Sequence, residues 1–116
     1  MNGLIVVLVA VTTLAVDPTL RFERERIGDV TFEACSMFDV NNDGTTDIVS
    51  GGYWFAGPDF KTPNKIAEIM RVDDYYDSFS DYPMDVNGDG WTDIVSGAWF
   101  GMTMLWRENP GEAGGE

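Results

Sequence analysis

Two short loops of this chain carry oxygen-bearing side chains at the spacing that calcium ions prefer. In each loop these side chains occupy positions 1, 3, 5 and 9. They are Asp39, Asn41, Asp43 and Asp47 in the first loop, and Asp85, Asn87, Asp89 and Asp93 in the second. Calcium is a hard cation that takes six to eight oxygens from carboxylates, amides, backbone carbonyls and water. We therefore predict two calcium sites, one in each loop.

The remaining loop positions fit the same chemistry. Position 6 is Gly44 or Gly90, where the sharp turn of a calcium loop disfavours a side chain. Position 7 is Thr45 in the first loop and Trp91 in the second. Because a Trp side chain has no oxygen, the ligand expected from Thr45 and Trp91 is the backbone carbonyl.

These loops differ from the helix–loop–helix type of calcium site. That type needs a Glu at position 12 and a following helix, whereas position 12 here is Ser50 or Ser96. The β-branched residues that follow each loop favour a strand, so we expect strand–loop–strand turns. Two other interpretations stay open: ordinary Asp/Asn/Gly surface turns, and degenerate loops that bind metal weakly.

The two loops are also copies of one another. Asp39–Gly51 and Asp85–Gly97 match at 11 of 13 positions and lie 46 residues apart. A repeat of this length with about four short strands is typical of β-propeller blades. We predict an all-β fold of two four-stranded blades in an incomplete propeller, with repeat one at about 30–72 and repeat two at about 79–111.

The strands expected within this plan follow from β-branched and aromatic residues between Gly and Pro turns. One runs out of each loop, over Asp47–Phe55 and Asp93–Phe100, and Asp73–Asp81 is expected as an acidic connection. Lys65–Val72 is expected as a strand, although its apolar spacing also fits a helical turn. The remaining expected strands are Thr19–Ile27, Thr31–Phe38, Tyr82–Met84 and Met102–Arg107.

Composition narrows the classes of function. The 116 residues suffice for one small domain, and 7 basic against 20 acidic residues give a net charge of −13. Such a charge argues against nucleic acid and anionic membranes as partners, and it suits a protein that binds cations. The absence of His removes the commonest general base, so no enzyme is expected. The single Cys35 is expected to be a small buried hydrophobe.

The N-terminus has the pattern of a secretory signal. Leu4–Val16 is apolar and uncharged, and Thr13–Ala15 fits a small-x-small cleavage pattern. We predict a signal over residues 1–16, a repeat region over 17–116, no membrane span after signal removal, and a secreted, extracellular or periplasmic protein. A buried strand is the rival interpretation of the apolar run.

The motif Asp-x-Asn-x-Asp-Gly-x-x-Asp-Ile-Val-x-Gly, present twice, resembles the FG-GAP/VCBS repeat family of integrin-α-like propellers and secreted bacterial proteins. Tyr53–Phe55 and Trp106–Gly111 also look like the bacterial members. The resemblance implies that each loop joins the first two strands of a blade and that its Asp and Asn side chains hold Ca²⁺. A closed propeller typically has four to eight blades, whereas this chain has only two such loops. The chain therefore resembles either the N-terminal piece of a longer propeller or a short protein that self-associates through an uncapped blade face.

These patterns predict a secreted calcium-binding repeat module with a structural, adhesive or ligand-binding role. The expected partner is an extracellular protein or glycan. The alternative is a fragment of a propeller enzyme or lectin that acts on extracellular polysaccharide. In that case the aromatic side chains stack on sugar rings rather than filling the space between blades. They are Tyr75, Tyr76, Tyr82 and the four Trp residues.

Overall fold

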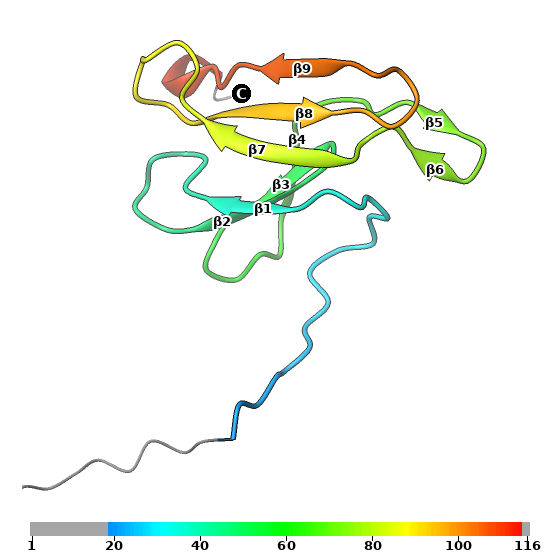
Figure 1. Cartoon of the computed structure of the whole chain (residues 1–116). Helices are drawn as coiled ribbons and strands as arrows, with labels where there is room; N and C mark the ends of the chain where they lie inside the picture. The colour runs from blue at the N-terminus through cyan, green and yellow to red at the C-terminus, as the bar shows by residue number, and fades with distance from the viewer. Residues whose placement is uncertain (1–18, 115–116) are drawn as a thin grey trace, which may run out of the picture.

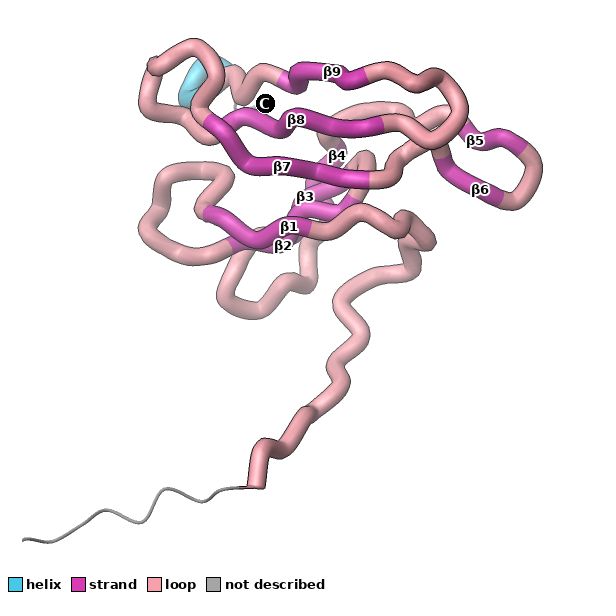
Figure 2. Tube along the Cα trace, viewed as in Figure 1, coloured by secondary structure: helices cyan, strands magenta, loops and turns pink. Residues whose placement is uncertain are grey.

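A computed structural model describes residues 19–114, and nearly all of their regular structure is β (Figures 1 and 2). The first sheet is antiparallel, in the order β1 (Ser36–Phe38), β2 (Asp47–Ser50), β3 (Tyr53–Phe55) and β4 (Pro63–Lys65). The second contains β7 (Ser80–Met84), β8 (Asp93–Gly97) and β9 (Met104–Arg107). A hairpin of β5 (Arg71–Val72) and β6 (Tyr75–Tyr76) lies between them in sequence, and a short 3-10 helix, Gly111–Gly114, follows β9. The all-β prediction is confirmed.

Each sheet is organised around one of the two loops. The first loop joins β1 to β2, which pair from Phe38 opposite Asp47, and the second joins β7 to β8, which pair from Met84 opposite Asp93. The next strand pairs in the same register in both sheets, with Val49 opposite Trp54 and Val95 opposite Trp106. The predicted strand–loop–strand arrangement is therefore confirmed. The predicted signal over residues 1–16 lies outside the described residues.

The prediction of two four-stranded units is correct for the first sheet only. The second sheet has three strands, and within residues 19–114 no strand pairs with the outer edge of β9. The sheets do not close into a barrel; instead they lie beside one another, with the β5–β6 hairpin projecting at one end (Figure 1). Propeller-type blades therefore stay a prediction.

Several strand boundaries predicted from the sequence are wrong. Asp47–Phe55 is not one strand but a hairpin, because the chain turns at Gly51 with a φ of 55°, a left-handed conformation that glycine adopts without strain. Lys65–Val72 contains only the end of β4 and all of β5, and the connection Asp73–Asp81 holds β6 and the start of β7. Local patterns therefore located the strands beside the two loops but missed the β2–β3 turn and strand β6.

Residues Thr19–Ile27 form no strand, although apolar and charged residues alternate there. The side chains of Leu20 and Phe22 are 81% and 87% exposed, and Figure 1 shows this segment running away from the sheets. An alternating pattern becomes a strand only where a sheet edge supplies hydrogen-bond partners. Strand Thr31–Phe38 is likewise shorter than predicted, since only Ser36–Phe38 pairs with β2.

The two sheets pack through opposite faces. Phe38, Val49 and Trp54 lie on one face of the first sheet by strand register, and we call this its covered face. Val49 is fully buried there, and Trp54 shares a groove with Ile94, which lies on the facing side of the second sheet. The contact between β1 and β7 continues this interface. The side chains of the two sheets thus build one small core.

A buried carboxylate connects the two sheets at this interface. Asp81 on β7 accepts a hydrogen bond at 3.0 Å from the backbone N–H of Gly51 in the β2–β3 turn. Its other oxygen accepts the Ser96 hydroxyl at 2.7 Å. A buried carboxylate is costly unless its oxygens are paired. The Ser96 bond pairs one oxygen within the second sheet, and the Gly51 bond connects that sheet to the first.

The interior of residues 19–114 is unusually polar for its size. Its four buried hydrophobic residues are Ala34, Val49, Phe55 and Ile94. Its five buried polar residues are Asp47, Ser78, Asp81, Asp93 and Ser96. So small an apolar core contributes little stability, which makes the fold depend on its polar networks. No helix in the described part of the chain is long and apolar enough to cross a membrane.

Candidate calcium loops

The first loop is shaped by its own side chains. Asp39 accepts hydrogen bonds from the backbone N–H groups of Asp43 at 3.1 Å and Gly44 at 2.8 Å. Asp43 accepts the N–H of Thr45 at 2.7 Å. The amide oxygen of Asn41 accepts the N–H of Asp43 at 3.2 Å. Positions 1, 3 and 5 therefore direct side-chain oxygens at the backbone N–H groups of the turn, while Asn41 and Asp43 remain exposed to solvent.

The second loop repeats this pattern. Asp85 accepts the N–H groups of Asp89 at 3.1 Å and Gly90 at 3.0 Å, and Asp89 accepts the N–H of Trp91 at 2.8 Å. The amide oxygen of Asn87 accepts the N–H of Asp89 at 3.1 Å. Two segments 46 residues apart thus share these hydrogen bonds, and the second loop adds one from the N–H of Gly88 to Asp85 at 2.7 Å.

Position 9 is the buried end of each loop. Asp47 and Asp93 are both fully buried, and both oxygens of each accept backbone N–H groups. Asp47 accepts from Val40 and from Gly57, both at 2.8 Å. Asp93 accepts from Val86 at 3.0 Å and from Asn109 at 2.8 Å. Each position-9 carboxylate thus closes its own loop and also holds the segment that leaves the third strand.

The ionised form of two loop carboxyls is favoured. The amide of Asn41 lowers the pKa of Asp43 below its ordinary value, and the N–H and side chain of Thr45 act in the same direction. Burial acts to raise the pKa of Asp93, but the N–H donors of Asn109 and Val86 and the side chain of Trp106 outweigh burial and lower it. Charged carboxylates are the form that a metal requires.

Backbone conformation explains the glycines and one difference between the loops. Gly44 and Gly90 have φ values of 85° and 89°, which a side chain would strain, although a Cβ there would meet no atom within 4 Å. Asn42 and Gly88 occupy the same place in the two loops, with φ values of 56° and 78°. Since Asn tolerates this region better than most residues, the exchange preserves the turn.

The donor set can be compared with what calcium requires. Carboxylate and amide oxygens lie at positions 1, 3, 5 and 9 of both loops, and oxygen-only donors suit a hard cation. Within residues 19–114, no three His, Cys, Asp or Glu side chains form a group that could hold a metal. A calcium site in either loop would therefore need the Asn oxygen and the carbonyl of Thr45 or Trp91 as well as the carboxylates.

The two loops are connected through Asn109, which follows β9, and through Asn42 in the first loop. The amide of Asn109 donates to the carbonyls of Val40 in the first loop, at 2.8 Å, and Thr92 in the second, at 3.1 Å. Asn42 donates to the carbonyl of Gly90 at 3.3 Å. The Asn-Pro pair at 109–110 was the only sequence signal for this link.

One side chain distinguishes the second loop from the first. The carboxylate of Glu108 accepts a hydrogen bond at 3.1 Å from the amide of Asn87, which also donates to Asp89 at 2.9 Å. Counting from the paired Trp54 and Trp106, the corresponding residue beside the first loop is Ala56. The second loop therefore has an additional carboxylate at its margin.

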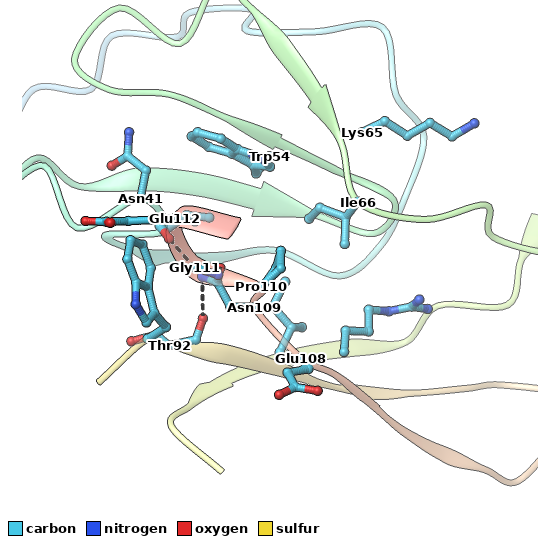
Figure 3. Close-up of a pocket in the computed structure, with 14 residues that line it drawn as sticks. Asn41, Trp54, Lys65, Ile66, Thr92, Glu108, Asn109, Pro110, Gly111 and Glu112 are labelled. Atoms are coloured by element: carbon cyan, nitrogen blue, oxygen red, sulfur yellow. Dashed lines mark hydrogen bonds between the residues drawn. The ribbon is translucent and has the colours of Figure 1, made fainter. Parts of the chain in front are cut away.

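A groove of about 440 Å³ lies beside the loops, between the two sheets. Its aromatic lining is Trp54 and Trp91, both half-buried. Trp54 lies across the groove from Asn109 and Pro110, whereas Lys65 directs its ammonium group away from it toward an ion pair with Glu68 (Figure 3). For the Trp residues, packing between blades and stacking on sugar rings are the two expected alternatives, and Trp99 and Trp106 are about half exposed.

Cys35 is exposed, which corrects the prediction of a buried hydrophobe. Partial burial raises the pKa of its thiol, and the negative charge of Asp81 on β7 acts in the same direction. Cys35 directly precedes β1 and lies 46 residues before Asp81, which stands opposite Ser96 on β8.

No family model, curated protein or solved structure matches this chain. The case for a function therefore depends on the geometry of the two loops and their surroundings.

Proposed function

We propose that this chain is a secreted calcium-binding repeat module, with a structural, adhesive or ligand-binding role toward an extracellular protein or glycan. The observation that supports it is the duplication of an oxygen-only loop, in sequence and in hydrogen-bond pattern. Ordinary surface turns need one Asx residue, whereas each loop here uses four oxygen-bearing residues at alternating positions.

In this proposal the loop residues hold the ion and no chemical step takes place. Asp39, Asn41, Asp43 and Asp47 supply side-chain oxygens in the first loop, and Thr45 supplies its carbonyl. The equivalent ligands in the second loop are Asp85, Asn87, Asp89 and Asp93, with the carbonyl of Trp91. A bound cation offsets the repulsion between carboxylates that the turn brings together, so binding stabilises the folded chain.

The expected consequence is a fold whose stability rises with free calcium. A ligand that binds only the folded state adds about 2.7 kcal/mol at one hundred times its dissociation constant. Extracellular calcium modules bind with dissociation constants on the order of 10⁻⁴–10⁻³ M, so millimolar calcium is the working range. Because the apolar core is small, a calcium contribution of this size would be a large share of the total stability.

Thermal unfolding of the full chain tests the proposal. We expect the melting temperature to rise on adding millimolar calcium to EDTA-treated protein, and to rise much less with magnesium. Asp43→Asn and Asp89→Asn should each reduce the rise, because each removes one charge from a loop while keeping the hydrogen bond to position 7.

Asp74→Asn is the matched control. Asp74 is almost fully exposed and belongs to the acidic segment outside the loops, so its replacement removes the same charge without touching a predicted ligand. An equal loss in all three variants would indicate diffuse attraction of cations to an acidic protein. A melting temperature of the unaltered chain that does not change with calcium would overturn the proposal.

The groove beside Trp54 supports a second candidate function, glycan binding by a lectin or a propeller enzyme. Exposed indole faces in a groove are suited to stacking on sugar rings. A glycan array with the unaltered chain, Trp54→Ala and the control Trp99→Ala would test this function, and a reducing-sugar assay would separate an enzyme from a lectin. No binding, or equal loss in both variants, would exclude the groove.

A further inference from the structure

The second sheet exposes one apolar face. Strand register places Tyr82, Val95 and Trp106 in one row across β7, β8 and β9, with Met84 and Met104 at the flanking positions of the same face. We call these five residues the open face. The exposed fractions of its four large side chains are 61% for Tyr82, 56% for Met84, 74% for Met104 and 50% for Trp106.

The open face carries no exposed charge. The other strand residues on it are Ser80, Gly97 and Asp93, and Asp93 is fully buried with both oxygens bonded to backbone N–H groups. In a chain with a net charge of −13, a contiguous neutral apolar surface is unusual. Such surfaces mark places where another protein surface packs.

The first sheet shows what covers a face of this kind. Val49 is the counterpart of Val95, and Trp54 is the counterpart of Trp106. Val49 is fully buried because the second sheet lies over it, whereas Val95 is only partly buried. The face that stays open at the end of the chain is thus the same face that a sheet of this chain covers at its beginning.

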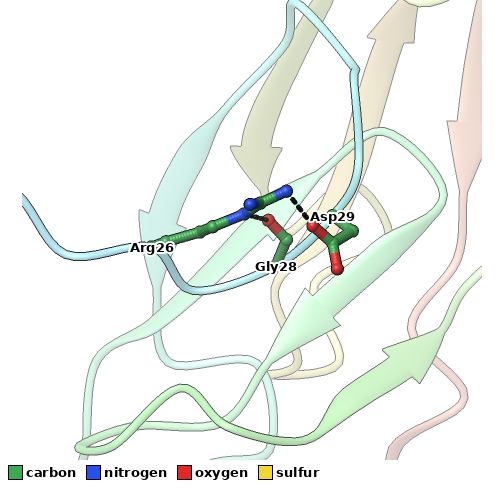
Figure 4. A network of polar contacts seen from close by, with 3 residues as sticks. All are labelled: Arg26, Gly28 and Asp29. Carbon is green, nitrogen blue, oxygen red and sulfur yellow. Dashed lines mark hydrogen bonds and ion pairs between the residues drawn. The ribbon is translucent and has the colours of Figure 1, made fainter.

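The far face of the first sheet is already occupied by residues 25–34. Gly28 lies so close to the ring of Phe55 that a Cβ there would be 2.9 Å from it, and Phe32 covers Gly51. Glu25 anchors the segment to Lys61 at 2.6 Å. Arg26 braces the turn through an ion pair with Asp29 and a bond to the carbonyl of Gly28 (Figure 4).

Residues 25–34, which we call the cap, limit how a second copy of the chain can bind. Stacking the far face of one chain on the open face of another would require residues 25–34 to be displaced. The open face has no such covering segment among residues 19–114, and its exposed neutral apolar side chains suit packing on a second open face. A self-complementary pairing of this kind closes after two copies and leaves no free face for further growth.

We propose that two copies of this chain form a two-fold dimer through their open faces, with Tyr82, Met104 and Trp106 at its centre. The proposal does not depend on calcium, because its residues lie on the strands rather than in the loops. The cap on the far face makes the dimer, and not a filament, the end point.

Sedimentation equilibrium of the full chain, from micromolar to millimolar protein and in both calcium and EDTA, tests the dimer. We expect a monomer–dimer equilibrium. Met104→Glu and Tyr82→Glu should each weaken the dimer at least about tenfold, since each places a charge in an apolar contact. Both side chains are mostly exposed in the single chain, and circular dichroism would verify that the variants fold.

Met37→Glu is the matched control. Met37 is 61% exposed but lies opposite Ile48 on the far face of the first sheet, so it should leave the dimer unchanged. A monomer at every concentration would overturn the proposal, as would assemblies larger than two. Loss of association in Met37→Glu, or its persistence in both open-face variants, would show that a different surface is used.

Discussion

The two sheets of this protein share a register but not an environment. Val49 and Val95 stand at the same point of matching strands, and each lies opposite a Trp. The first is fully buried and the second is not, because the second sheet covers the first while nothing in residues 19–114 covers the second. Identical local sequence therefore gives identical local structure, whereas burial is decided by the neighbour.

The loops behave differently from the sheets that carry them. Both loops share five hydrogen bonds among positions 1–7 and a buried carboxylate at position 9, and the second loop has one more bond, from the N–H of Gly88 to Asp85 at 2.7 Å. The hydrogen bonds of positions 1, 3 and 5 are thus made within each nine-residue segment, whereas the position-9 carboxylates also accept N–H groups outside it, from Gly57 and Asn109. Changes in the loops should have equal effects in both copies, and changes in the sheet faces should not.

The largest expected effect comes from the buried carboxylates. Asp47→Ala or Asp93→Ala leaves two backbone N–H groups without acceptors, so each should lower the free energy of unfolding by about 2–5 kcal/mol. Urea denaturation in EDTA measures this cost apart from calcium. Costs that differ strongly between the two variants would contradict the equivalence of the loops.

The paired valines test the difference between the sheets. Val49→Ala removes a fully buried side chain and should cost about 2 kcal/mol, from lost apolar burial and the cavity that remains. Val95→Ala should cost less than about 1 kcal/mol in the monomer because its site is already partly exposed. Denaturation at low protein concentration compares the two variants. Equal costs would refute the assignment of Val49 to a covered face and of Val95 to an open face.

Asn109 should couple the stabilities of the two loops. Asn109→Ala removes the bonds to the carbonyls of Val40 and Thr92 but keeps its own N–H on Asp93, so we expect a cost of about 1–2 kcal/mol. A double-mutant cycle with Asn42→Gly, which removes the contact to Gly90, would reveal whether the loops are coupled. Strict additivity would mean that they respond independently.

The smallest effect concerns Cys35, the counterpart of Asp81. Partial burial and the Asp81 charge raise the thiol pKa, so less reactive thiolate is present at mildly alkaline pH in the folded chain than in the unfolded one. Alkylation with iodoacetamide should therefore be slower in the folded chain, and its pH–rate midpoint should lie higher. A folded chain that reacts as fast as the unfolded chain would contradict this environment.

The sequence predicted what local chemistry determines. The loops, their flanking strands and the turn at position 6 follow from Asp, Asn and Gly spacing, because their hydrogen bonds close within a few residues. The hairpin at Gly51 was missed because the β-branched and aromatic residues on both sides outweighed the turn signal of Gly51 and Gly52 between them. Exposure of Cys35, the Asp81 bridge and the link through Asn109 depend on how the sheets meet, which no local pattern records.

Calcium titration calorimetry on the EDTA-treated full chain tests the central claim most directly. The two loops predict two calcium ions bound per chain, and one in each of the variants Asp43→Asn and Asp89→Asn if the remaining loop is intact. No heat of binding in the unaltered chain, or a stoichiometry that neither loop variant changes, would contradict the claim that these loops are calcium sites.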